Sequence, residues 1–209
     1  MTRRFVIIGQ KATASPEFSL IDLPGTSGRL DVLLRCLRSA LLVSHGLRRD
    51  TIVYLVLLGG PRAPRVLRVD GNEIRFVRPD ERALALLVQK ALARVTPPAE
   101  VGAFVPIRPG LAVASGDLEA VIADLGSSVA SSYILEEEGR DVRAGTLASE
   151  DVVVFVGDNH GFDAVTRGRL EALGAVAIGV GPISLHADDA ITIVCNEMDR
   201  RRDTPGATP

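Results

Sequence analysis

Two hydrophobic strands in the last third of the chain each run directly into a loop that contains glycine. Residues 152–156 read Val-Val-Val-Phe-Val and continue into Gly-Asp-Asn-His-Gly. A second apolar run ends in Gly-Val-Gly-Pro-Ile-Ser-Leu-His-Ala-Asp-Asp, residues 179–189, before an apolar helix. Glycine loops at the carboxyl ends of strands form a small-molecule crevice in an α/β sheet. The pattern therefore predicts an α/β fold with a ligand site near the end of the chain.

Generic nucleotide motifs do not explain these loops. Pro182 and Ser184 break the turn-then-helix pattern of a dinucleotide-binding fingerprint, and no acidic residue follows about twenty positions later on a strand. The chain also lacks the Gly-Lys-Ser/Thr run of a phosphate-binding loop. From the loops alone, a cofactor site and ordinary strand-to-helix turns both remain open.

Hydrophobic periodicity outlines alternating strands and helices. Leucines at helical spacing predict a helix over residues 29–45, with Gly46 as its stop. Two runs, residues 65–69 and 74–77, predict a hairpin around Asp-Gly-Asn. A Pro/Gly-rich stretch, residues 96–110, is the candidate linker, and residues 203–209 are expected to be disordered. The remaining strands are expected at 5–9, 51–58, 111–114, 129–135, 152–156 and 175–180, and the remaining helices at 80–95, 117–125, 162–173 and 188–202.

Composition limits the class of protein. A chain of 209 residues with 46% hydrophobic content is long enough for one buried core. Its two cysteines form no Cys-x-x-Cys pair, which favours a reducing, cytoplasmic location, and no apolar stretch reaches membrane-spanning length. Its three histidines lack ligand spacing, so we expect no metal.

The charges are distributed unevenly along the chain. Residues 1–94 hold 16 Lys and Arg against 8 Asp and Glu, whereas the rest of the chain holds 8 against 18. The basic front half has the sign needed to contact phosphates, although a basic solvated surface is the simpler alternative. Arginine makes up 22 of the 24 basic residues, which is also compatible with genome composition.

Several segments spread over residues 3–200 resemble one known family in the same order. They are residues 22–31 (Asp-Leu-Pro-Gly-Thr-Ser-Gly-Arg-Leu-Asp), 44–50 (Ser-His-Gly-Leu-Arg-Arg-Asp), 79–82 (Pro-Asp-Glu-Arg), 186–188 (His-Ala-Asp) and 196–199 (Asn-Glu-Met-Asp), besides the two loops. Together they resemble the archaeal tRNA pseudouridine-54 N1-methyltransferases of the SPOUT superfamily, which use S-adenosylmethionine. The resemblance implies one SPOUT domain over residues 1–202. Its sheet is mostly parallel and flanked by helices, with a deep trefoil knot in the cofactor-binding half, residues 111–202, and an RNA-facing half, residues 1–95.

The same resemblance implies the cofactor contacts. By position they are Leu135, Gly157, Val180, Gly181, Pro182, Ile183, Ser184, Leu185 and Ala190. Many family members carry cysteine at the last of these positions. This chain has Ala190 there, so a catalytic thiol at that position is impossible.

Methylation of N1 of pseudouridine requires loss of a proton whose pKa lies well above neutral, and a positioned carboxylate could accept it. Asp31 is the expected base, and Arg29 the expected partner of a phosphate or a uracil carbonyl. A simple helix-start pair, with Asp31 favouring the helix dipole, remains the alternative. Arg48, Arg49 and Arg82 are the expected phosphate contacts.

The sequence thus predicts an S-adenosylmethionine-dependent enzyme that methylates N1 of pseudouridine 54 in tRNA and acts as a homodimer. Methylation of a ribosomal RNA pseudouridine and a non-catalytic RNA-binding module remain the alternatives, because one scaffold can serve different RNAs.

Overall fold

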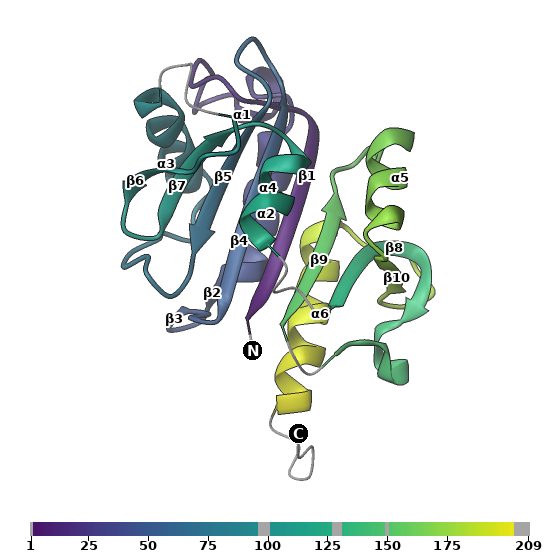
Figure 1. The fold of residues 1–209 in the computed structure, drawn as a ribbon. Coiled ribbons are helices and arrows are strands. Elements are labelled where there is room, and N and C mark those ends of the chain that lie inside the picture. Colours follow the sequence, from purple (N-terminus) through teal and green to yellow (C-terminus); the bar gives the residue numbers. More distant parts are fainter. Residues whose placement is uncertain (1, 96–100, 127–130, 149–150, 203–209) are drawn as a thin grey trace.

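The computed structural model describes residues 2–95, 101–126, 131–148 and 151–202. Eight strands form one sheet in the order β10-β8-β9-β1-β4-β5-β7-β6 (Figure 1). These strands are β1 (Arg3–Thr13), β4 (Thr51–Gly59), β5 (Arg65–Asp70), β6 (Val105–Arg108), β7 (Leu111–Ser115), β8 (Ser131–Asp141), β9 (Val152–Gly157) and β10 (Val176–Gly179). The helices are α1 (Leu23–Thr26), α2 (Leu30–Leu41), α3 (Glu81–Arg94), α4 (Leu118–Leu125), α5 (Ala164–Ala172) and α6 (Ala187–Arg202).

The sheet is mostly parallel, as the sequence predicts. β1 pairs in parallel with β4 and β9, and β8 pairs in parallel with β9 and β10. The other half, from β4 through β5 and β7 to β6, is antiparallel. The parallel half brings the carboxyl ends of β8, β9 and β10 to one edge, where the predicted loops begin.

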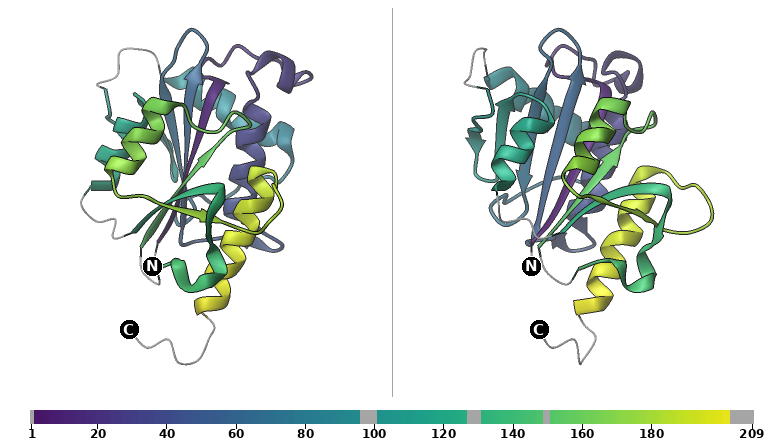
Figure 2. Two further views of the ribbon diagram at one scale, coloured as in Figure 1. Left: turned by 90° about the vertical axis from the view of Figure 1, so that its right-hand side faces the viewer. Right: turned by 45° about the vertical axis from the view of Figure 1, so that its right-hand side comes forward.

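Helices cover both faces of this sheet (Figures 1 and 2). Side chains alternate between the faces along a strand, so Phe5 and Ile7 of β1 join the hydrophobic cluster of α2, α3 and α6. Val6 and Ile8 join a second cluster with α4 and Leu170 of α5. The final helix α6 packs against α2, although β10, the strand before it, lies at the far edge of the sheet.

Two sequence predictions in the front half are wrong. The partner of β5 in the hairpin is β4, because Ile52 to Leu57 pair with residues 65–70, whereas residues 74–77 form no strand. Ile74 instead donates its backbone N–H to the carbonyl of Asp70 and is buried in the core. The first long helix ends at Leu41, four residues earlier than predicted, because Leu42 and Val43 pair with Gly46 and Leu47 as the short strands β2 (Leu42–Val43) and β3 (Gly46–Leu47).

The Pro/Gly-rich stretch predicted as a linker, residues 96–110, contains a strand. Residues 96–100 lie outside the described residues, as does the predicted disordered tail, residues 203–209. β6 forms within the rest of this stretch and pairs with β7. Residues 105–108 of this stretch therefore belong to the sheet.

A bulge in β8 shapes the edge of the sheet next to the loops. Ile134 pairs with Ala177 of β10, but the next pair joins Arg140 to Ile178, so residues 135–139 lie outside the ladder between β8 and β10. A Cβ atom at Gly139 would lie 2.2 Å from the carbonyl carbon of Ile178, so only glycine permits this approach. Beyond β8, Val142–Thr146 forms a kinked turn, η2, in which Gly145 has a φ angle of 79°, and the sequence did not predict it.

Candidate active site

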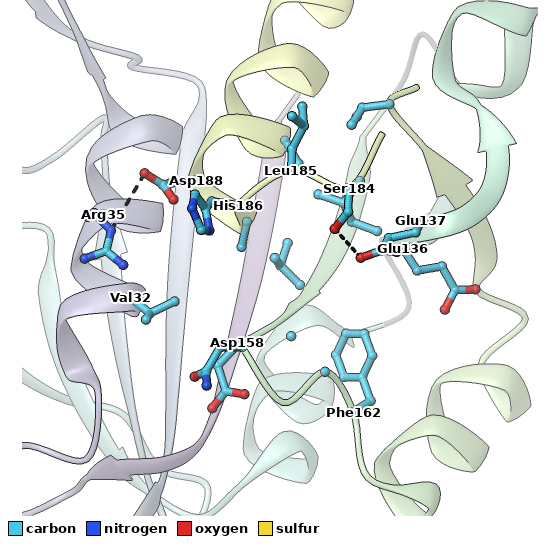
Figure 3. A pocket seen from close by; sticks show the side chains of 18 of the residues that line it. Val32, Arg35, Glu136, Glu137, Asp158, Phe162, Ser184, Leu185, His186 and Asp188 are labelled. Atoms are coloured by element: carbon cyan, nitrogen blue, oxygen red, sulfur yellow. Dashed lines mark hydrogen bonds and ion pairs between the residues drawn. The ribbon is translucent and has the colours of Figure 1, made fainter. Parts of the chain in front are cut away.

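A cavity of about 670 Å³ opens where the carboxyl ends of β8, β9 and β10 meet the first turns of α2 (Figure 3). Eight of the nine predicted cofactor residues line it, and so does Arg29. The eight are Leu135, Gly157, Val180, Gly181, Ile183, Ser184, Leu185 and Ala190; Pro182 is not among the lining residues. The loops that the sequence singled out therefore converge on one hollow.

The loop between β10 and α6 forms one wall of this cavity. It leaves the sheet after Gly179 and adopts no regular structure until Ala187. Ile183 is 74% exposed and Leu185 is 42% exposed, so both apolar side chains are left open to a ligand. A flat, partly apolar ligand that covered them would be stabilised by the area that it removes from water.

The turn after β9 forms the floor, and Asp158 fixes it. The carboxylate of Asp158 accepts hydrogen bonds from the backbone N–H groups of Gln10, at 2.7 Å, and His160, at 2.8 Å. Its own backbone N–H donates to the carbonyl of Ile8, and Gly161 donates back to the carbonyl of Asp158. Because the turn folds over Gly157, a Cβ atom at that position would lie 2.8 Å from the backbone of Gly161.

The opposite wall is the start of α2, where Arg29 faces the cavity. Arg29 has a φ angle of 68°, a left-handed conformation that costs roughly 1–2 kcal/mol for a residue with a Cβ atom. Its guanidinium donates two hydrogen bonds to the carboxylate of Asp31, at 3.0 and 3.2 Å. This fork–fork pair holds Arg29 toward the cavity.

Asp31 itself is buried and bound by a second arginine. Nη1 of Arg35, one helical turn further along, lies 3.0 Å from Oδ2 of Asp31. Burial alone would raise the pKa of Asp31, but the hydrogen bonds and charges of Arg29 and Arg35 outweigh it and hold the pKa below its ordinary value. A carboxylate with a lowered pKa is a weaker proton acceptor, which disfavours the base role expected from the sequence.

Carboxylates of the β8 bulge line the side of the cavity away from α2. Glu136 forms an ion pair with Arg167 of α5. Glu137 accepts a hydrogen bond from the hydroxyl of Ser184 (Figure 3). These acidic side chains suit a ligand that carries positive charge. Sequence reasoning missed them, although the run Leu-Glu-Glu-Glu-Gly follows an expected strand just as the two glycine loops do.

The three arginines expected to contact phosphates lie elsewhere. Arg48 is ion-paired with Asp199, at 2.7 Å, and Arg49 donates to the carbonyls of Gly71 and Ile74, at 2.8 Å each. Arg82 is exposed on α3. Arg48 and Arg49 thus use some of their N–H groups in hydrogen bonds within the chain. The phosphate role of all three arginines stays a prediction.

Within the described ranges, no three His, Cys, Asp or Glu side chains are grouped so that they could hold a metal ion. No helix in this part of the chain combines the length and the apolar character needed to cross a bilayer.

Comparison with known proteins identifies relatives over the full length of the chain. A family model of SAM-dependent RNA methyltransferases matches residues 2–203. The tRNA (pseudouridine(54)-N(1))-methyltransferase of Methanosarcina acetivorans is 40% identical over 207 residues, which cover 99% of this chain and 95% of that protein. The enzyme of the same name from Methanococcoides burtonii is 38% identical over 198 residues, which cover 95% of this chain and 96% of that protein.

A solved structure shares the fold. Nep1 of Archaeoglobus fulgidus, bound to S-adenosylhomocysteine, aligns with a TM-score of 0.64 over 98% of this chain and 100% of that chain. The two sequences are 18% identical in this alignment. The likeness therefore supports the mixed, mostly parallel α/β architecture described above.

Proposed function

The chain belongs to the family of SAM-dependent RNA methyltransferases, and from its full-length likeness to the tRNA (pseudouridine(54)-N(1))-methyltransferases we propose that it methylates N1 of pseudouridine 54 in tRNA. The observation that carries this proposal at the level of the site is the convergence of eight predicted cofactor residues and Arg29 on one cavity. The methyl donor is S-adenosylmethionine.

The residues at the cavity fit this cofactor. The loop 180–186 offers backbone donors and acceptors beside the exposed side chains of Ile183 and Leu185, as an adenine ring requires. The carboxylates of Glu136 and Glu137 suit the positive charges of the donor. Ala190 lies at the start of α6 and is 7% exposed, so a contact from this position would come largely from its backbone.

Bound S-adenosylmethionine supplies an electrophilic methyl carbon. For this methyl group to pass to N1, the N1–H bond would have to break, and the donor's sulfur would leave as a neutral thioether. We propose that Arg29 faces the uracil ring and offsets the charge that develops on a carbonyl as N1 loses its proton. Asp31, with its lowered pKa, acts by holding Arg29 in place, and the proton leaves to solvent.

Three finer features are proposed with this function. The return of the chain from β10 at the sheet edge to α6 beside α2 supports a trefoil knot in this half. A homodimer is the second feature, and analytical ultracentrifugation of the protein at micromolar concentration tests it. A cytoplasmic location, where tRNA is modified, stays a prediction.

The deciding experiment compares two tRNA transcripts that differ only at position 54. One carries pseudouridine and the other uridine, whose N1 is bonded to ribose and cannot accept a methyl group. We expect N1-methylpseudouridine, measured by mass spectrometry of the nucleosides, from the first transcript alone. Methylation of a pseudouridine-containing ribosomal RNA fragment and not of tRNA would move the substrate to the ribosome, and transfer to neither would refute the enzyme assignment.

A further inference from the structure

A second hollow lies beside the cofactor cavity. It is a groove of about 860 Å³ bordered by the C-terminal half of α2, the β2–β3 hairpin, residues 75–79 and the first turns of α6. Asp188 lines both this groove and the cofactor cavity. The two hollows therefore adjoin each other.

Helix α2 is their common wall. Val32 and Arg35 line the cavity, and Arg38, Ser39 and Leu42 line the groove. Positions three and four apart lie on one side of a helix, so these residues form one stripe. At 1.5 Å per residue, the stripe from Val32 to Leu42 extends about 15 Å, which leads from the methyl-donor site into the groove.

The groove is lined by arginine side chains, two of which form no ion pair with the described residues. Arg38 and Arg75 are exposed and form no ion pair with any residue that the structure describes. Arg48 and Arg49 add to the positive charge of the lining, although their side chains are held by Asp199 and by backbone carbonyls. The acidic lining residues, Asp188 and Asp189, lie at the α6 end. An anionic ligand is the occupant that this charge favours.

An exposed aromatic side chain, Phe76, also lines this groove, and hydrogen bonds fix its backbone. Phe76 is 69% exposed, which is unusual for a large apolar side chain. Its carbonyl accepts a hydrogen bond from Arg108, at 3.2 Å, and the carbonyl of Ile74 accepts one from Arg49, at 2.8 Å. The backbone is thus held at Ile74 and at Phe76 itself. The exposed guanidinium groups of Arg38 and Arg75 line the same groove.

We propose that this groove binds a nucleotide of the substrate RNA next to the target, with Phe76 stacked on its base and Arg38 and Arg75 against its phosphates. The inference rests on the proposed function. Exposed aromatic rings beside cations are the usual platform for an unstacked base. A second copy of the chain is the alternative occupant, and the mass in ultracentrifugation distinguishes it from RNA.

The test measures three quantities for Phe76→Ala, Phe76→Trp and the control Val176→Ala, an exposed apolar residue at the amino end of β10. They are the Kd for pseudouridine-54 tRNA at fixed salt, the Kd for S-adenosylmethionine and the mass in ultracentrifugation. We expect Phe76→Ala to weaken tRNA binding about 5- to 150-fold, the range for loss of one stack, and to raise KM more than it lowers kcat. Phe76→Trp should stay within about threefold of the wild type, because it keeps a ring. Cofactor affinity and mass should not change.

Charge gives an independent readout. Arg38→Gln and Arg75→Gln should each lower the slope of log Kd against log salt by roughly 0.7–0.9, whereas Arg62→Gln, which removes a partner of Glu17 outside the groove, should not. Unchanged tRNA affinity in Phe76→Ala, or a loss of dimer mass in that variant, would overturn the proposal. Methyl transfer by the wild-type protein is measured separately, so failure of the groove and failure of the proposed function are distinguishable.

Discussion

Arg3 and Asp199, near the two ends of the described chain, form an ion pair of 2.6 Å that ties the first strand to the last helix. Arg3 is 1% exposed and also lies 3.0 Å from Asp50, and Asp199 also binds Arg48. Arg202 pairs with the same Asp50. This network fixes α6 against β1 and against the loop before β4. Since α6 begins at the cofactor cavity, the network also holds one wall of the site.

Arg3→Met should lower the free energy of unfolding by about 3 kcal/mol, because it leaves two carboxylates without their buried partner. Arg48 and Arg202 remain beside those carboxylates, which keeps the loss at the lower end of the range for a broken buried pair. Urea unfolding at pH 7 measures it. Arg62→Met, which removes an exposed pair with Glu17, should cost no more than about 1 kcal/mol, and an equal loss in both variants would contradict a special role for Arg3.

The stability supplied by this network should depend on pH through Asp50. Burial raises the pKa of Asp50, but the charges of Arg3 and Arg202 outweigh it and lower the pKa below its ordinary value. A carboxyl whose pKa is lower in the folded state stabilises the protein above its unfolded pKa, about 3.9, and loses that contribution as the pH falls through the folded pKa. Asp50→Asn should therefore cost more at pH 7 than at pH 3 in urea unfolding. A cost that is the same at both values would show that the charge of Asp50 is not what stabilises the fold.

The cofactor loops could be predicted from the sequence because their signal is local. A hydrophobic strand followed at once by glycine marks both the strand and the place where it ends, and Gly157 and Gly181 both line the cavity. The same reasoning would have found Glu136 and Glu137, had the run after residue 135 been compared with the other two loops. The bulge that turns both carboxylates to one cavity depends on the pairing of β8 with β10, which the sequence does not reveal.

Partners far apart in the sequence explain the remaining differences. Charge predicts that Arg48 faces a phosphate, which stays a prediction, but no local signal reveals its ion pair with Asp199, 151 residues away. The residues 74–77 alternate like a strand, yet β5 already has β4 on one side and β7 on the other, so no edge is left for them. The sequence already offers Arg29 as a helix-start partner of Asp31, but the burial of Asp31 and its second arginine, Arg35, become evident only when α2 is folded.

The pH dependence of methyl transfer separates the two roles of Asp31. If Asp31 holds Arg29 and the proton leaves to solvent, the rate should rise with pH between 6 and 9, because N1 must lose its proton. Asp31→Asn should lower kcat by roughly 10²-fold or more at every pH, since loss of a positioned charge is costly, and should leave the slope unchanged. Single-turnover rates with pseudouridine-54 tRNA give this profile.

Two results would restore the base role. A wild-type rate that does not depend on pH, together with an Asp31→Asn rate that rises with pH, would show that Asp31 accepts the proton. Arg29→Lys is the matched variant, because it keeps the charge but cannot form the bidentate pair. We expect it to behave like Asp31→Asn, with S-adenosylmethionine affinity close to that of the wild type. Asp117→Asn, at the cap of α4 away from the cavity, is the control for a change of charge alone.

Both cysteines should be unreactive in the folded protein. Cys36 and Cys195 are fully buried, and burial raises the pKa of Cys195 to about 11 and that of Cys36 further still. Since the thiolate is the reactive form, a thiol reagent at pH 8 should label neither residue until the protein unfolds. Labelling in the native state, followed by intact mass, would show that α2 and α6 open locally.

Two glycine-to-alanine substitutions distinguish the cofactor turn from an ordinary glycine position. In Gly157→Ala the new methyl group would lie 2.8 Å from the backbone of Gly161, and because backbone cannot rotate away, the turn that carries Asp158 must shift. We expect S-adenosylmethionine binding to weaken about tenfold or more, which is about 1.4 kcal/mol, in calorimetry with the folded variant. Gly168→Ala lies in α5 with no atom within 4 Å of the new methyl group, so it should raise stability by roughly 0.5–1 kcal/mol and leave cofactor affinity unchanged. If Gly157→Ala binds the cofactor as tightly as Gly168→Ala, the turn after β9 does not form part of the cofactor site.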